Sequence, residues 1–228
     1  VSLFFLAFLP QFADPLKGSM TLQLVLLVVL ALRLMRPSGK KDFLTLPLLA
    51  ASGLLLLAGF LVRSFRIQFA AITNTYEALT FFSLCITLLL VIYRLSKKSK
   101  LPQSIFFGGV FVSIVFLALA SSPIAPSDIR PPVPALQSYW LVLHVALSFA
   151  GEAFFVVAFV SSLLFLTTRD QVKRKEFDRI TYTAIAIGYP VYTVGALIFG
   201  AIWASYAWGR FWSWDPKETW ALVTALVY

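Results

Sequence analysis

The most constraining feature of this chain is a series of long runs of apolar residues. They cover roughly residues 19–34, 43–62, 76–93, 105–120, 139–167 and 181–203. A helix needs about 20 apolar residues to cross a hydrocarbon core about 30 Å thick. Only 13% of the 228 residues are charged and 60% are hydrophobic, whereas a soluble domain has about 25% charged residues. The sequence therefore predicts an integral membrane protein.

The continuous character of these runs indicates the fold class. Backbone in lipid must satisfy its own hydrogen bonds, which leaves helices or a closed barrel, and barrel strands would alternate polar and apolar residues. We predict an all-α, polytopic transmembrane helix bundle with about six full spans. Residues 1–12 are too short to span, and a last helix begins near Pro216. Because the chain starts at Val1 and stops inside an apolar pattern at Tyr228, we expect a single membrane domain, 1–228, truncated at both ends.

Basic residues are distributed unevenly among the connections. The stretches 33–41, 94–100 and 169–179 hold most of the 19 Lys and Arg residues. The positive-inside rule assigns them to the cytoplasmic side or its organellar equivalent. The alternate connections, 63–77 and 121–140 together with the segment 204–220, then share the outer face. Topology accounts for the net charge of +9, so we expect no nucleic acid partner.

Residues 208–220 read WGRFWSWDPKETW and contain four of the six tryptophans. Tryptophans gather at membrane interfaces as an aromatic belt, which could account for Trp140 and Trp203. A belt spreads around a bundle, however, whereas these rings are concentrated in one connection. Flat aromatic surface beside fixed charges suits a large planar ligand with anionic edges.

The same segment predicts the start of a helix. Asp215 is a suitable N-cap, Pro216 suits the first helical position, and Glu218 is the N3 acid of a capping box. Part of the motif is therefore structural whatever else it does.

His144 is the only histidine of the chain. It lies about 7 Å below the predicted outer end of its helix, on the same side of the membrane as the tryptophans. Ser148 and Gly151 follow on the same helical face. The imidazole is either a metal or haem ligand or a histidine hydrogen-bonded within the bundle. Glu152, deeper in the helix, is either a functional acid or a neutral, hydrogen-bonded glutamate.

Four segments together resemble one family. They read TNTYEALTFF, PPVPALQSYWLVLHV, RITYTAIAIGYPVYTVGALIFGAIWA and WGRFWSWDPKETWALVT. The last resembles the tryptophan-rich WWD signature of haem-handling membrane proteins, and the set is most similar to the cytochrome c biogenesis protein CcsA family, called ResC or CcsB in some bacteria. The resemblance runs from about residue 60 to the end of the chain.

The resemblance implies a function in cytochrome c maturation. Haem b would be held at the outer face and presented for covalent attachment to the CxxCH motif of apocytochrome c. A CcsB/ResB-type membrane subunit would be the partner, and the chain, if enzymatic, would be a subunit of a cytochrome c synthase in a bacterial plasma membrane or a thylakoid membrane. The haem ligand would be His144, and the remaining haem-binding residues would be Trp208, Gly209, Arg210, Trp212, Trp214 and Asp215.

Several details stay open at this point. The propionates would be neutralised by Arg210, our preferred candidate, or by Lys217, Arg130 or the pair Arg63 and Arg66. The family has further histidines after the signature, beyond the last residue of this chain, so a second axial ligand is not identified. Ala225 and Glu152 also depart from the residues common in the family, and no catalytic base is identified.

Three alternatives remain beside this interpretation. A CcmC- or CcmF-like protein would also handle haem but deliver it differently. A small-molecule transporter without haem would not depend on His144. A structural membrane subunit would use its tryptophans only as anchors.

Overall fold

The computed structural model describes residues 15–35, 44–96 and 101–228, with side chains from Leu22 onward. These ranges contain helices and turns but no strand. The elements in chain order are α2 (Pro15–Leu34), α3 (Thr45–Ile67), α4 (Thr75–Leu95), α5 (Gln103–Ala120), η1 (Pro134–Leu136), α6 (Tyr139–Thr167), α7 (Gln171–Tyr192), η2 (Thr193–Phe199), α8 (Gly200–Trp208) and α9 (Pro216–Val227).

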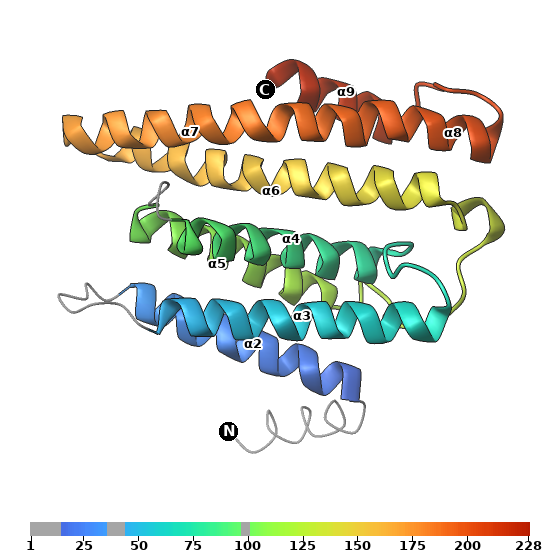
Figure 1. Ribbon diagram of the computed structural model, residues 1–228, viewed down its shortest axis with the longest axis horizontal. Helices are drawn as coiled ribbons and strands as arrows, with labels where there is room; N and C mark the ends of the chain where they lie inside the picture. Colours follow the sequence, from blue (N-terminus) through green and yellow to red (C-terminus); the bar gives the residue numbers. More distant parts are fainter. Residues whose placement is uncertain (1–14, 36–43, 97–100) are drawn as a thin grey trace.

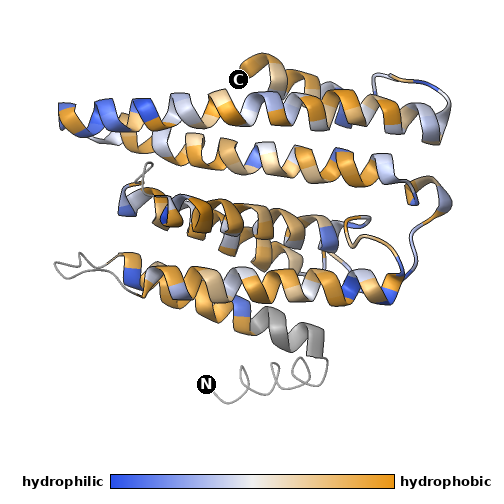
Figure 2. Ribbon diagram, in the orientation of Figure 1, coloured by the Kyte–Doolittle hydropathy of each residue, from blue (hydrophilic) through white to orange (hydrophobic). Residues whose placement is uncertain are grey.

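The predicted all-α, polytopic bundle is confirmed. Within the described residues, five helices are long and apolar enough to cross a membrane, and Leu22–Leu34 forms a shorter apolar helix. The long helices run side by side (Figure 1), and hydrophobic residues extend along them (Figure 2). The prediction for residues 1–12 lies outside the described residues.

The ends of the helices alternate between two faces. The carboxyl ends of α3, α5 and α8 lie at one end of the bundle, together with the connections 68–74, 121–138 and 209–215 (Figure 1). The α6–α7 connection and the first turns of α7, which are rich in Lys and Arg, lie at the other end (Figure 1). We call the first end the outer end, following the positive-inside rule.

One boundary differs clearly from the prediction. We expected residues 169–179 to be a connection, but α7 begins at Gln171 and continues through η2 and α8 as a helix of 38 residues. Asp170 caps this helix by accepting a hydrogen bond from the Val172 N–H, and Lys, Arg and Glu are good helix formers. At 1.5 Å per residue the helix is about 57 Å long, so its charged first turns extend beyond the hydrocarbon.

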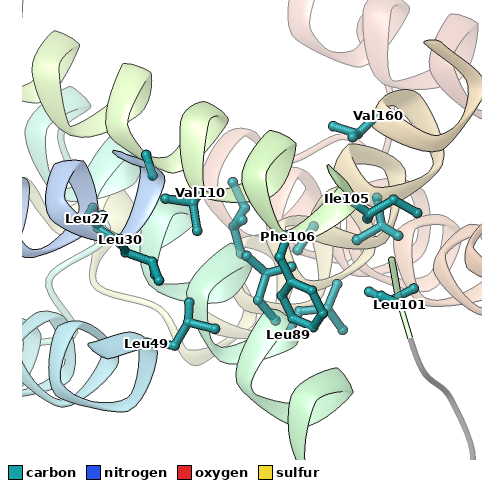
Figure 3. Packing of buried hydrophobic residues seen from close by; sticks show 14 of the residues in the cluster. Leu27, Leu30, Leu49, Leu89, Leu101, Ile105, Phe106, Val110 and Val160 are labelled. Atoms are coloured by element: carbon teal, nitrogen blue, oxygen red, sulfur yellow. The ribbon is translucent and has the colours of Figure 1, made fainter. Parts of the chain in front are cut away.

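The main core lies among α2, α3, α4, α5, α6 and α7. Leu27 and Leu30 of α2, Leu49 of α3, and Ile105 and Val110 of α5 are fully buried there. Figure 3 shows several of these side chains packed between the helices. A smaller cluster of Phe155, Tyr192, Ala196 and Ala225 joins α6 to η2 and α9.

Glycines bring α6 unusually close to the long helix after it. A Cβ added to Gly151 would come within 2.6 Å of the Tyr192 backbone nitrogen, and one on Gly195 would come within 2.5 Å of the Ser148 nitrogen. Small residues permit this close backbone approach between membrane helices. The contact fixes the position of η2 against the outer half of α6, where His144 lies.

Candidate functional site

His144 is held by a backbone carbonyl on the neighbouring helix. Its Nδ1 lies 2.9 Å from the Gly195 carbonyl oxygen. A carbonyl can only accept, so Nδ1 carries the hydrogen and, in the neutral imidazole, Nε2 carries the lone pair. The side chain is only partly buried. The hydrogen bond thus orients the ring and leaves one nitrogen with ligand character.

The carbonyl of Gly195 is available because the helix is a π-helix at this point. η2 follows Pro190, which lacks an N–H and interrupts the regular hydrogen-bond pattern. The Gly200 N–H donates to the same Gly195 carbonyl, which therefore accepts two hydrogen bonds with its two lone pairs. Gly200 also gives the imidazole room, since a Cβ there would come within 3.1 Å of the His144 ring. Short π-helical segments occur often at functional sites.

Trp203 connects His144 to the tryptophan-rich segment. Its ring lies nearly parallel to the imidazole, with an interplanar angle of 4° and centroids 6.1 Å apart. The same ring meets Trp208 edge to face, again with centroids 6.1 Å apart. Its Nε1 donates to the Ala135 carbonyl in the outer loop at 3.2 Å. Three outer elements therefore meet at one indole.

The chain turns sharply after Trp208. Gly209 ends α8 with a φ of 74° and donates its N–H to the Ser205 carbonyl, the left-handed cap that favours glycine. Trp208 is 60% exposed, and Arg210 is also exposed. The turn thus places an exposed indole and an exposed guanidinium next to each other in the chain at the outer end.

Trp212 and Trp214 form a second aromatic pair. Their rings meet edge to face with centroids 5.6 Å apart. Trp214 is 70% exposed and has a φ of 59°, a left-handed conformation that is strained for a bulky residue. The Nε1 of Trp212 is buried and has no hydrogen-bond partner among the described residues. Strained backbone and unsatisfied buried hydrogen-bond donors are found at functional sites more often than elsewhere.

The predicted helix start at Asp215 is confirmed, with one difference. The Asp215 side chain accepts a hydrogen bond from the Glu218 N–H at 2.8 Å, and Pro216 occupies the first helical turn. Glu218 does not return to the N-cap residue itself. Its carboxylate accepts hydrogen bonds from the Ser213 N–H and hydroxyl instead, which fixes the backbone between the two tryptophans.

Comparison with known proteins identifies the family. A profile described as "Cytochrome C assembly protein" matches residues 72–228, which include His144 and the whole tryptophan-rich segment. This chain belongs to the CcsA family of cytochrome c assembly proteins. The family assigned from four short segments is thereby confirmed.

Relatives named "Cytochrome c biogenesis protein CcsA" support the assignment. The protein of Chlamydomonas reinhardtii is 35% identical over 79% of this chain and 54% of its own length. The protein of Mesostigma viride is 32% identical over 73% of this chain and 65% of its own length. The protein of Prochlorococcus marinus (strain MIT 9303) is 29% identical over 83% of this chain and 71% of its own length. The chain thus spans about half to two thirds of these CcsA proteins.

The predicted residues of this CcsA-family chain fall into two groups. His144 and Trp208 are joined through Trp203, while Trp212 and Trp214 contact one another beside Asp215. Trp203 is the residue that the sequence interpretation missed as a site residue. We assigned it to an interfacial belt, and only the pairing of α6 with α8 reveals its contact with His144.

One candidate for the propionates is contradicted by the structure. Arg63 is 5% exposed and forms a salt bridge of 2.8 Å with Glu77, which is fully buried. Its other nitrogens donate to the carbonyls of Ser127 and Asp128. Every terminal nitrogen of this guanidinium is thus engaged, so Arg63 is not available to an anionic ligand. The TNTYE segment that carries Glu77 is therefore a structural element of the outer end.

Proposed function

We propose that this chain binds haem b at its outer end and presents it for covalent attachment to apocytochrome c. The observation that carries the proposal is the orientation of His144 by Gly195, beside Trp203 and Trp208. The names of the CcsA relatives, which refer to cytochrome c biogenesis, favour the same function. The chain would act in a bacterial plasma membrane or a thylakoid membrane with a CcsB/ResB-type subunit.

The state of His144 fits an axial ligand. Histidines that bind metals usually donate their second ring nitrogen to a carbonyl or carboxylate, which fixes the tautomer, and Nδ1 of His144 lies at hydrogen-bond distance from such a carbonyl. Among the described residues, no group of three or more His, Cys, Asp or Glu side chains could hold a free metal ion. A single histidine suits an ion that a macrocycle already coordinates.

The indoles fit the remaining surface of a porphyrin. Trp208 and Trp214 are mostly exposed although their rings are large and apolar. A planar apolar ligand would bury them at about 25 cal/mol per Å² of apolar surface removed from water. Arg210, exposed in the same turn, remains the preferred partner for a propionate.

In this proposal the protein contributes chiefly by positioning. Haem supplies the vinyl groups that react with the two thiols of a CxxCH motif. His144 would hold the iron, the Trp208 and Trp214 indoles would cover the macrocycle, and Gly209 would let the backbone turn beside it. Correct orientation of reacting groups contributes up to about 7–11 kcal/mol in well-arranged systems.

The visible spectrum of the purified protein tests the proposal. We expect a Soret band that is lost in His144→Ala and weakened in Trp208→Ala and Trp214→Ala. Trp140→Ala is the matched control, because Trp140 is also a partly exposed outer tryptophan but stacks on Phe199 instead. The control should retain the band.

Two outcomes would contradict the proposal. An unmodified protein without any Soret band after expression with haem would favour a transporter or a structural subunit. A band that survives His144→Ala unchanged would mean that the iron is held elsewhere. Cytochrome c maturation in cells that depend on this chain supplies the second measurement, and His144→Ala should abolish it.

A further inference from the structure

The buried salt bridge at the outer end has a second set of partners that connects it to the candidate haem site. Arg63 lies on α3 and Glu77 on α4, and their side chains meet at 2.8 Å. The Arg63 guanidinium also lies 4.6 Å from the centre of the Tyr76 ring. We call Arg63 and Glu77, with the Ser127 and Asp128 carbonyls that Arg63 binds, the outer latch.

The outer latch fixes the loop between α5 and α6. Nη1 and Nη2 of Arg63 donate to the Ser127 and Asp128 carbonyls at 2.9 and 2.8 Å. A planar guanidinium can bind a carboxylate and two carbonyls at once, whereas a lysine ammonium offers no such fork. The Glu77 carboxylate is also fixed by its own segment, because its second oxygen accepts hydrogen bonds from the Thr73 N–H and hydroxyl.

The loop between the latch and the site, residues 129–135, is rich in proline and therefore restricted in conformation. Pro131, Pro132 and Pro134 follow Asp128 closely, and proline fixes φ near −65°. The Gln137 side chain donates to the Pro132 carbonyl at 2.7 Å. At the far end the Ala135 carbonyl accepts the Trp203 Nε1 hydrogen, and the Trp203 ring lies parallel to His144.

We propose that Arg63 and Glu77 are positioning residues for the haem site, acting through the 127–135 loop on Trp203. This inference rests on the proposed function. The latch does not touch the ligand. It keeps Ala135 in place, and Ala135 keeps the Trp203 indole against His144 and Trp208. Loss of the fork should therefore disturb the iron ligand although Arg63 belongs to a different helix.

Three variants separate positioning from folding. Arg63→Ala leaves the buried Glu77 carboxylate without its countercharge and risks unfolding. The double variant Arg63→Ala/Glu77→Gln removes both charges, so the folding penalty is reduced while the two loop carbonyls still lose their donors. Arg63→Lys keeps the charge but not the fork. Phe65→Ala is the control, because Phe65 is 78% exposed and lies two residues further along the same helix.

The measurements are haem content, the Soret maximum and the midpoint potential of the purified protein, together with amide hydrogen exchange of residues 121–138. We expect the double variant and Arg63→Lys to lose haem by about tenfold, the lower end of the effect of changing partners of metal ligands. Residual haem should show a shifted Soret band and potential. Exchange should accelerate in the loop and in the first turn of α6.

The results distinguish this inference from the proposed function. If the unmodified protein and Phe65→Ala carry haem that requires His144, and the double variant matches them in haem content, spectrum and potential, the latch does not position the site. If the unmodified protein binds no haem, the proposed function fails first and the inference fails with it. Faster exchange confined to residues 127–128, with unchanged haem, also overturns it.

Discussion

Two helices, α4 and α9, begin at the outer end of the bundle with the same capping arrangement but in different surroundings. At α4, Asn74 accepts a hydrogen bond from the Glu77 N–H, and the Glu77 carboxylate returns to Thr73. At α9, Asp215 accepts from the Glu218 N–H, and the Glu218 carboxylate returns to Ser213. Each helix is thus capped by an N-cap side chain and an N3 glutamate.

The two helix starts differ in how completely the polar and charged groups around them are paired. Glu77 is fully buried, and Arg63 neutralises it. Near Asp215 the aromatic rings are exposed, Trp214 is strained, and the Trp212 Nε1 has no partner among the described residues. Arg210 forms no salt bridge within the described part of the chain. We infer that the α4 corner (Thr73, Asn74 and Glu77 with Arg63) is internally satisfied and acts on the site only through the 127–135 loop. The α9 corner (Trp212, Trp214, Asp215 and Glu218) instead leaves aromatic surface exposed for a ligand.

The largest expected effect follows from breaking the buried pair. Arg63→Ala should lower the free energy of unfolding by about 3–5 kcal/mol, because an uncompensated charge remains in the interior. Thermal unfolding in detergent measures the change. Lys217→Ala, at an exposed base next to the α9 corner, should change stability by less than about 0.5 kcal/mol. Equal losses at both corners would remove the contrast.

The two helix caps should show similar, smaller effects. Asn74→Ala and Asp215→Ala each remove one hydrogen bond from an N-terminal N–H, which costs about 1 kcal/mol. Their common geometry predicts equal changes in unfolding free energy, although only Asp215→Ala should reduce the Soret band. A cap at Asn74 that costs several times more than the one at Asp215 would show that burial, not the cap itself, determines its contribution.

The fold was largely predictable because it depends on apolar run lengths. The bounds of α4, α5 and α6 fall within two residues of the apolar runs, since a bilayer requires a minimum length. The start of α9 was predictable because Asp215, Pro216 and Glu218 act on adjacent backbone groups. The start of α7 was not, because its first turns carry charged residues, and a search for apolar runs excludes them.

The candidate site was predictable only as separate parts. His144 and the tryptophans are conspicuous as residue types, but their connection through Trp203 depends on the π-helix and on Gly151 and Gly195, which bring the helices together. The role of Arg63 was missed for a similar reason. Arg63 and Glu77 are fourteen residues apart in the chain, and their side chains form a buried contact of 2.8 Å. From the sequence alone this pair cannot be distinguished from two exposed charges.

A further comparison concerns the two non-glycine residues with positive φ. Gln68 has a φ of 57° at the carboxyl end of α3, and Trp214 has a φ of 59° in the α9 corner. Glycine adopts this conformation without the cost of about 1 kcal/mol borne by other residues. Trp214→Gly should therefore be about 1 kcal/mol more stable than Trp214→Ala, measured by thermal unfolding.

Haem content separates strain that serves a ligand from strain that only ends a helix. Both Trp214 variants should weaken the Soret band, whereas Gln68→Gly should leave it unchanged. If Trp214→Gly retained full haem content, the strained indole would have no part in the site.

The smallest effect on stability, and the most specific for the ligand, is expected at Arg210. Its guanidinium is exposed and forms no salt bridge with another described residue, so Arg210→Ala should change the unfolding free energy by less than about 0.5 kcal/mol. If it pairs with a propionate, its loss should weaken haem binding, and the remaining affinity should depend less on salt, since exposed ion pairs are screened. Titration of haem at two ionic strengths measures both quantities, with Arg130→Ala, at an exposed base paired with Asp128, as the control. An equal loss of affinity in both variants would indicate a general attraction by the basic outer loops, whereas a loss confined to Arg210→Ala would place the anionic edge of the ligand at the turn between Trp208 and Trp212.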